Sequence, residues 1–136
     1  MTTFALLDEG SSVTLIEKKV ASEIGLTGPE ESFIIEGVAG ARTEASSSRR
    51  VSLYINGVHT DKEHKIEART IDSLNLNHQS VDADMIEGCD HLLEITEDLT
   101  YDRGTPTLLI GQDNWHLIIS RKIRSGGCRD PVASLT

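Results

Sequence analysis

The chain has 136 residues, of which 38% are hydrophobic and 26% charged, as expected for one globular domain with a single core. Its net charge of −9 argues against a nucleic-acid partner, which would require clustered Lys and Arg. No apolar run approaches the roughly 18 residues that span a bilayer, and Met1 to Thr3 lack the basic start of a signal peptide. We therefore expect an intracellular protein without a membrane partner. Cys89 and Cys128 lack a CxxC partner, which favours reduced thiols but leaves a disulfide open.

The first 26 residues predict two short strands separated by a turn, and then a helix. The apolar run at residues 4–7 is typical of a buried strand, and residues 13–16 form a second such run. Apolar residues recur at helical spacing within residues 17–26, and Gly25 is placed as a C-cap. Because only 4% of the residues are aromatic, we expect a core of Leu, Ile, Val and Ala.

Two hairpins are predicted between residues 33 and 66. The first starts with the strand at residues 32–35 and has a glycine-rich tip at residues 36–41. The second contains residues 51–55, where apolar and polar residues alternate as in a half-buried strand. Asn56-Gly57 follows directly and is a strong hairpin signal.

The second half of the chain predicts fewer regular elements. Residues 71–103 have no clean hydrophobic period and are interpreted as a partly ordered insertion, with a short helix or strand at residues 91–95. Residues 107–111 predict a buried strand ending in glycine, and residues 115–119 predict another strand with Trp115 as a core anchor. We expect one domain over residues 1–124 and a loosely held tail over residues 125–136.

The candidate catalytic group lies in Ala5-Leu6-Leu7-Asp8-Glu9-Gly10-Ser11-Ser12. The predicted strand delivers the Asp8 carboxylate to a tight turn, Gly10 allows close backbone approach, and the two serine hydroxyls could donate to the carboxylate. Peptide hydrolysis by this chemistry needs two carboxylates that share one proton. Taken alone, the motif also fits an ordinary turn or capping aspartate.

Three motifs in a fixed order resemble the retroviral-type aspartic proteases, the retropepsins. They are the Asp-x-Gly-Ser turn, the Gly37-Val38-Ala39-Gly40 tip, and Thr105-Pro106-Thr107-Leu108-Leu109-Ile110-Gly111. Within that family, the sequences of the first and last of these motifs are most similar to the protease segment of BEL/Pao retrotransposon polyproteins. The resemblance implies a mostly β fold, a closed barrel of short strands with one or two short helices. It also implies that Gly37, Val38, Ala39 and Gly40 form a substrate-covering flap, and that Leu109, Ile110 and Gly111 support the site.

The resemblance implies an aspartic endopeptidase that processes its own Gag-Pol-like polyprotein, in the cytoplasm or in virus-like particles. Only one Asp-x-Gly-Ser occurs in the chain, so a homodimer would have to supply the second Asp8. Glu9 stands where the family carries threonine or serine, and two such glutamates would repel each other across a dimer axis. An inactive peptide-binding or scaffold module and a structural segment of a polyprotein therefore remain as alternatives.

Other chemistries have weaker support in the sequence. His59 and His64 flank Asp61 and Glu63, but this polar segment is better interpreted as a solvated hairpin end than as a metal site. Neighbours such as Cys89 and His91 rarely meet in the geometry of a thiol nucleophile and its base. The G-x-S-x-G motif of a serine hydrolase is missing. We predict no metal and no cofactor.

Overall fold

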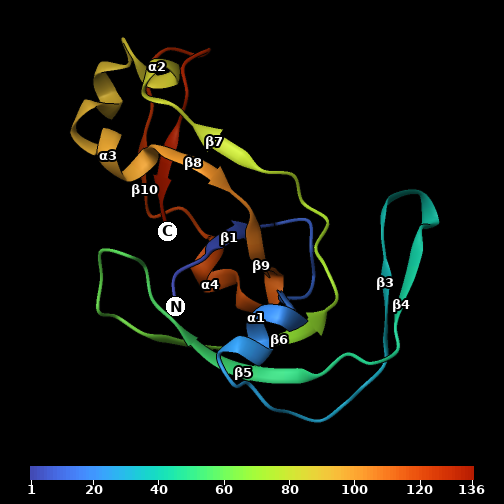
Figure 1. The fold of residues 1–136 in the computed structure, drawn as a ribbon. Coiled ribbons are helices and arrows are strands. Elements are labelled where there is room, and N and C mark those ends of the chain that lie inside the picture. The colour runs from blue at the N-terminus through green and yellow to red at the C-terminus, as the bar shows by residue number, and fades with distance from the viewer.

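The computed structural model describes residues 1–136 and is mostly β, with 36% strand and 22% helix (Figure 1). Its main feature is a five-stranded sheet in the order β1-β9-β2-β6-β5. These strands are β1 (Phe4–Leu7), β2 (Leu15–Glu17), β5 (Arg50–Ile55), β6 (His64–Ile71) and β9 (Pro106–Ile110). The predicted mostly β class is confirmed.

The prediction of a closed barrel is wrong, because the two edge strands of this sheet do not meet. β1 pairs only with β9, and β5 pairs only with β6. The remaining strands form three separate two-stranded sheets. These are β3 (Phe33–Glu36) with β4 (Arg42–Ala45), β7 (Gln79–Val81) with β8 (Tyr101–Gly104), and β10 (Lys122–Arg124) with β11 (Ala133–Leu135).

All helical elements are short. They are α1 (Lys18–Glu23), η1 (Val38–Gly40), α2 (Ala83–Ile86), η2 (Asp90–Ile95), α3 (Thr96–Leu99), η3 (Gln112–Asn114) and α4 (Trp115–Ile118). None of them has the length and apolar character that crossing a membrane requires. The predicted helix within residues 17–26 is confirmed by α1, and residues 91–95 are helical rather than extended.

Strand β9 lies at the centre of the arrangement that positions the candidate site. It runs parallel to β1 on one side and antiparallel to β2 on the other, with Leu109 facing Leu6 and Leu15 in register. The chain that leaves β1 must therefore pass around the end of β9 before it enters β2. Asp8 and the rest of the motif lie in this connection, which is called the 8–14 turn below.

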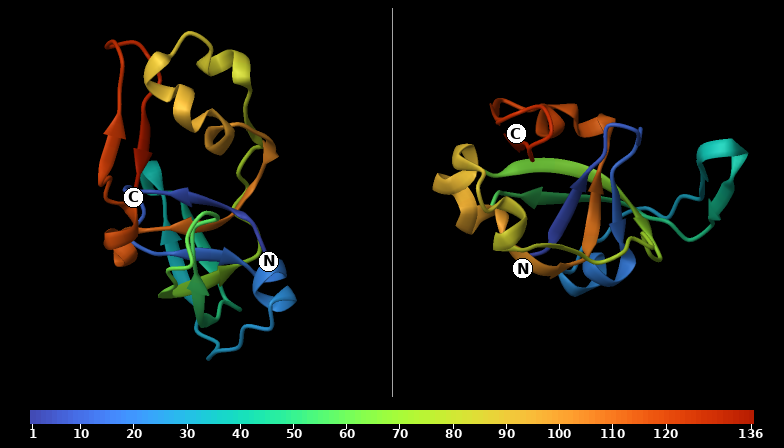
Figure 2. Two further views of the ribbon diagram at one scale, coloured as in Figure 1. Left: turned by 90° about the vertical axis from the view of Figure 1, so that its left-hand side faces the viewer. Right: turned by 90° about the horizontal axis from the view of Figure 1, so that it is seen from above.

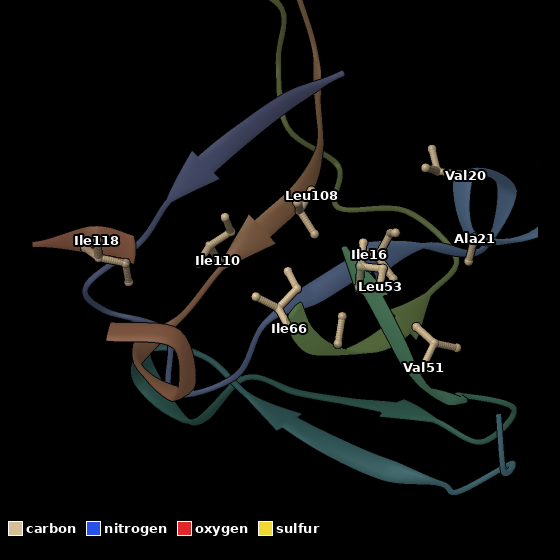
Figure 3. Packing of buried hydrophobic residues seen from close by; sticks show 10 residues of the cluster. Ile16, Val20, Ala21, Val51, Leu53, Ile66, Leu108, Ile110 and Ile118 are labelled. Atoms are coloured by element: carbon tan, nitrogen blue, oxygen red, sulfur yellow. The ribbon is translucent and has the colours of Figure 1, made fainter. Parts of the chain in front are cut away.

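The hydrophobic core contains only aliphatic side chains, as the low aromatic content predicted. Ten buried residues form it, and Figure 3 shows them converging from the sheet, α1 and α4. They are Ile16, Val20, Ala21, Val51, Leu53, Ile66, Ala68, Leu108, Ile110 and Ile118. The alternation predicted for residues 51–55 is confirmed, because Val51 and Leu53 are buried while Ser52 and Tyr54 are exposed.

A small truncation in this core should be measurable. Ile66 is 2% exposed and faces Leu53 across the β5–β6 pair. We expect Ile66→Val to lower the free energy of unfolding by about 0.5–1.5 kcal/mol, because one buried methyl group is lost and the cavity closes only in part. Denaturant unfolding should detect the difference. Val58→Ala is the control, since the Val58 side chain is 78% exposed and its truncation should leave the midpoint unchanged.

Both predicted hairpins between residues 33 and 66 are confirmed, as β3–β4 and β5–β6. Asn56-Gly57 does not form a two-residue turn, because β5 ends at Ile55 and β6 begins only at His64. The Asn56 side-chain amide instead donates to the Thr60 carbonyl at 3.0 Å and closes part of a longer loop.

Two predictions about apolar runs are wrong. Residues 4–7 form a strand, but it is an edge strand with Phe4 42% exposed, rather than a buried one. Residues 115–119 contain the helix α4 instead of a strand, since the Ile119 amide donates to the Trp115 carbonyl at 3.2 Å. Trp115 is 43% exposed, and it is Ile118, 4% exposed, that anchors this segment in the core.

The insertion and the tail are more regular than their sequences indicate. Residues 71–103 contain β7, α2, η2 and α3 and lead into β8. Within residues 125–136, β11 folds back antiparallel on β10, and the Pro131 carbonyl lies 2.8 Å from His91 Nε2. Tail and insertion thus lie together at one end of the molecule (Figure 1).

Candidate active site

Asp8 is the first residue after β1 and is half-buried. Its backbone amide donates to the Ile110 carbonyl at 3.0 Å, which extends the β1–β9 pairing by one residue. Its Oδ1 accepts a hydrogen bond from the Gly10 amide at 2.9 Å. Its Oδ2 has no hydrogen-bond partner within the chain. The turn therefore orients the carboxylate with one oxygen and leaves the other oxygen available.

The 8–14 turn is held by the residues that follow β9. The Gln112 amide donates to the Ser11 carbonyl at 2.8 Å, and its side-chain amide donates to the Glu9 carbonyl at 2.6 Å. Gly111 lies directly beneath the turn, where an added Cβ would be 2.6 Å from the Val13 carbonyl oxygen. Only glycine permits this close approach. Thus the structure brings Ile110 and Gly111, predicted as supporting residues, against the Asp8 turn.

A buried threonine connects both segments. Thr14 is fully buried, and its hydroxyl donates to Asp113 Oδ1 at 2.6 Å. Thr14 Oγ1 also accepts from the Gly111 amide at 3.1 Å and from the Asn114 side-chain amide at 2.8 Å. Asp113 Oδ2 also accepts from the Thr14 amide at 3.0 Å. All hydrogen-bonding capacity of the hydroxyl is used, so this network fixes where the turn rejoins the sheet.

Sequence reasoning missed Thr14, Gln112, Asp113 and Asn114 as parts of the site. A signal was present, because three polar residues follow Ile110-Gly111 directly and one polar residue interrupts the apolar run at 13–16. Buried polar side chains need hydrogen-bond partners, and here Thr14 forms hydrogen bonds with Asp113 and Asn114.

Replacing Thr14 by Val keeps the shape of the side chain but removes the hydroxyl. The Gly111 amide and the Asp113 carboxylate then lose a partner in a buried environment, which costs about 1–3 kcal/mol. We expect Thr14→Val to lower the free energy of unfolding by that amount in denaturant titrations. Thr14→Ser, which retains the hydroxyl, should lose less; equal losses for both variants would contradict the assigned network.

The serines of the motif do not contact the Asp8 carboxylate. The Ser11 hydroxyl donates to the Val13 carbonyl at 2.8 Å, so it stabilises its own turn. Ser12 is exposed and its side chain has no hydrogen bond. The expectation that these hydroxyls donate to Asp8 is therefore not met within the single chain, and the Gly10 amide takes that role instead.

Glu9 is exposed, and its carboxylate forms neither a hydrogen bond nor an ion pair within the chain. Only its carbonyl is engaged, by Gln112. The exposed Glu9 thus follows the half-buried Asp8 directly in the turn. A second copy approaching this turn would meet the Glu9 carboxylate.

The predicted flap residues form the tip of the β3–β4 hairpin. The Gly37 amide donates to the Ala41 carbonyl at 2.7 Å and closes the tip. Ala39 and Gly40 have φ values of 59° and 76°, a conformation that glycine adopts easily and alanine rarely. Val38 is 94% exposed. The tip therefore presents its backbone and the Val38 side chain to the surroundings.

The hairpin projects from the five-stranded sheet on the side toward which the 8–14 turn also projects (Figures 1 and 2). The Arg42–Glu36 ion pair at 2.6 Å joins its strands next to the tip, and at its base the Arg69 guanidinium lies 5.5 Å from the Phe33 ring centroid. No hydrogen bond or ion pair joins the hairpin to the turn. Within one chain, the flap residues and Asp8 thus lie on the same side of the five-stranded sheet, with no hydrogen bond or ion pair between them.

The other side chains considered from sequence are not assembled into a site. His59 pairs with Asp98 at 3.0 Å, and both are largely exposed. Cys89 and Cys128 are free. No group of three His, Cys, Asp or Glu is placed to hold a metal ion. An apolar cavity of about 330 Å³ lies between α1 and the loop after β5, and Asp8 does not line it.

Comparisons with protein-family models, curated proteins and solved structures each find no match to this chain. The likeness to retropepsins therefore rests on the residues of the 8–14 turn, the hairpin tip and the end of β9.

Proposed function

We propose that the chain is a retropepsin-like aspartic endopeptidase of a retrotransposon polyprotein, most similar to the BEL/Pao type and active as a homodimer. The observation that carries the proposal is the geometry of Asp8. One carboxylate oxygen is held by the Gly10 amide and the other is free, on a turn whose backbone is fixed by β9 and Thr14. The Gly10 amide orients the carboxylate as in an Asx turn, and Oδ2 stays available to a water molecule or a second carboxyl group.

In the proposed reaction, the two Asp8 carboxyl groups of the dimer share one proton. The ionised carboxylate takes a proton from a water molecule, and the water oxygen bonds to the carbonyl carbon of the substrate. The protonated carboxyl group gives its proton to the carbonyl oxygen. When the C–N bond breaks, the carboxyl group that took the water proton gives it to the amine nitrogen. The other carboxylate takes a proton from one hydroxyl group of the intermediate, so that a new carboxyl group forms and the pair again holds one proton.

The substrate in this proposal is an extended peptide, with the chain's own polyprotein as the natural source. The tip residues Gly37 to Gly40 would cover it, because their exposed backbone can hydrogen-bond the main chain of any sequence. The largely unattached hairpin is suited to such closure.

A dimeric site makes cleavage depend on concentration, which tests the proposal directly. We expect the purified chain to cleave an unstructured protein at mildly acidic pH, with a rate per chain that rises with chain concentration until dimers dominate. Mass spectrometry of the products would identify the cleaved bonds. Absence of cleavage at all concentrations, or a rate per chain independent of concentration, would reject a dimeric protease.

Glu9 favours a second candidate function, an inactive peptide-binding module of the same architecture. Its unpaired carboxylate next to Asp8 adds negative charge where two copies would have to approach each other. In this case the chain would bind unstructured peptides without cutting them. Binding measured by fluorescence anisotropy, together with intact peptides after long incubation, would support the module over the protease.

A further inference from the structure

A second cavity, of about 400 Å³, lies between helix α1 and the base of the β3–β4 hairpin. Glu30, before β3, and Arg49, after β4, form an isolated antiparallel bridge at this base. The polar part of the cavity wall consists of Lys18, Ser22, Glu30, Ser47, Arg49 and Thr70. Two cationic side chains thus face one carboxylate in the wall, although the chain as a whole carries a net charge of −9.

The Arg49 guanidinium has only weak partners within the chain. Its Nη1 lies 3.5 Å from the Gly28 carbonyl oxygen, and its Nη2 lies 3.5 Å from Glu30 Oε2. Strong hydrogen bonds between a cation and a carboxylate are shorter, about 2.7–2.9 Å. Because a guanidinium has five N–H donors, most of the hydrogen-bonding capacity of Arg49 remains available to a ligand.

Lys18 and Ser47 also keep unused donors. The Lys18 ammonium donates to Ser47 Oγ at 2.6 Å and pairs with Asp72 Oδ1 at 2.7 Å. An ammonium has three N–H donors, so one is left over. The Ser47 hydroxyl accepts from Lys18, and its own proton has no acceptor within the chain. Together these two side chains offer one N–H and one O–H.

Thr70 adds a donor in a buried position. It is only 2% exposed, and its Oγ1 accepts from the Arg49 backbone amide at 2.8 Å. The hydroxyl proton itself has no acceptor within the chain. A buried donor without a partner costs free energy, which an acceptor oxygen of a ligand in the cavity would recover.

We propose that this cavity binds a phosphate group, either as inorganic phosphate or as the phosphate of a small monoester. Donors from α1, from the segment before β5 and from β6 surround the cavity, and a tetrahedral oxyanion can offer each of them a different oxygen. A carboxylate has only two oxygens and would leave more of these donors unpaired. Asp8 does not line the cavity, so the proposal is independent of the proposed protease activity.

Binding of inorganic phosphate is measured by isothermal titration calorimetry at constant ionic strength and mildly alkaline pH, where phosphate is mostly a dianion. We expect Arg49→Gln to weaken binding about tenfold or more, because a charged donor is lost. Glu30→Gln should strengthen binding about two- to fivefold, because the carboxylate no longer competes for the guanidinium.

The Arg42–Glu36 ion pair near the hairpin tip provides matched controls. Arg42→Gln and Glu36→Gln change the net charge of the chain by the same amounts as Arg49→Gln and Glu30→Gln, but neither residue lines the cavity. Both controls should bind phosphate as the wild type does. Controls that reproduce the two effects would reduce them to the net charge of the chain and overturn the site.

Two further variants keep the test independent of any single substitution. Lys18→Gln should weaken phosphate binding about fivefold or more, and Thr70→Val should weaken it more than Thr70→Ser, which retains the hydroxyl. Circular dichroism would establish that each variant is folded. A wild-type chain that binds no phosphate at millimolar concentrations, or one that binds acetate equally well, would overturn the proposal.

Glycerol phosphate distinguishes the two sources of the phosphate group. Tighter binding of glycerol phosphate than of inorganic phosphate, with the same loss in Arg49→Gln, would identify a monoester whose organic part occupies the remaining volume of the cavity. Tighter binding of inorganic phosphate, with that same loss, would identify the free anion. Binding of both compounds that is unaffected by Arg49→Gln and Lys18→Gln would place the anion elsewhere and reject the site.

Discussion

Replacing Asp8 by Asn is expected to reduce peptide cleavage by about 10²- to 10⁴-fold, the contribution typical of a positioned acid or base. The amide cannot take a proton from water or share one with the second Asp8. The turn itself should persist, since the Asn Oδ1 can still accept from the Gly10 amide at the present 2.9 Å. The change therefore removes the chemistry without removing the fold.

The loss is measured as initial rates on an unstructured protein substrate, with Asp61→Asn as the matched control. Asp61 is exposed and makes no hydrogen bond or ion pair, so its replacement should leave the rate unchanged. Mixing wild-type chains with equal amounts of Asp8→Asn chains should lower the wild-type rate to about half, because random pairing places half of the wild-type chains in mixed dimers. Cleavage by Asp8→Asn at the wild-type rate would exclude Asp8 from catalysis.

Replacing Gly111 by Ala is expected to lower the free energy of unfolding by about 3 kcal/mol or more, at the upper end of overpacking effects. The new Cβ would lie 2.6 Å from the Val13 carbonyl oxygen and 2.9 Å from the Ser11 carbonyl oxygen. Both atoms belong to the backbone, so no side chain can rotate away. Relief of the clash would have to move the turn that carries Asp8, and cleavage should fall along with stability.

Gly37→Ala provides the control for this effect in denaturant unfolding. An added Cβ at Gly37 would be 3.7 Å from its nearest neighbours, an ordinary contact, and the backbone there has a negative φ of −100°. We expect its midpoint to match that of the wild type. If Gly111→Ala were equally neutral, the 8–14 turn would not be packed on the end of β9 as described.

The candidate site was partly predictable because its main parts are local in sequence. A run of apolar residues that stops at Asp8-Glu9-Gly10 predicts a strand followed by a turn, and the structure has β1 and the 8–14 turn there. Residues 107–111 likewise predict a strand that ends in glycine. The Thr14 network was not predictable in the same way, because its partners lie about one hundred positions away and only folding brings them within hydrogen-bond distance.

The wrong predictions about the fold also concern features that depend on residues distant in sequence. An apolar run such as residues 115–119 fits a strand or a buried helical turn equally well, and the neighbours that decide between them are distant in sequence. The closed barrel followed from the resemblance, but closure depends on whether edge strands meet, which strand patterns cannot determine. Here β1 and β5 remain the edges of an open sheet.

The sequence by itself determined the mostly β class, the aliphatic core, the two hairpins and the turn that carries Asp8, because each follows from short-range periodicity, composition or turn chemistry. Only the tertiary structure decided that β9 lies between β1 and β2, that Thr14 holds the turn, and that Oδ2 of Asp8 stays free. These features depend on contacts between backbone segments that are separated by most of the chain length, and local sequence carries little information about such long-range contacts.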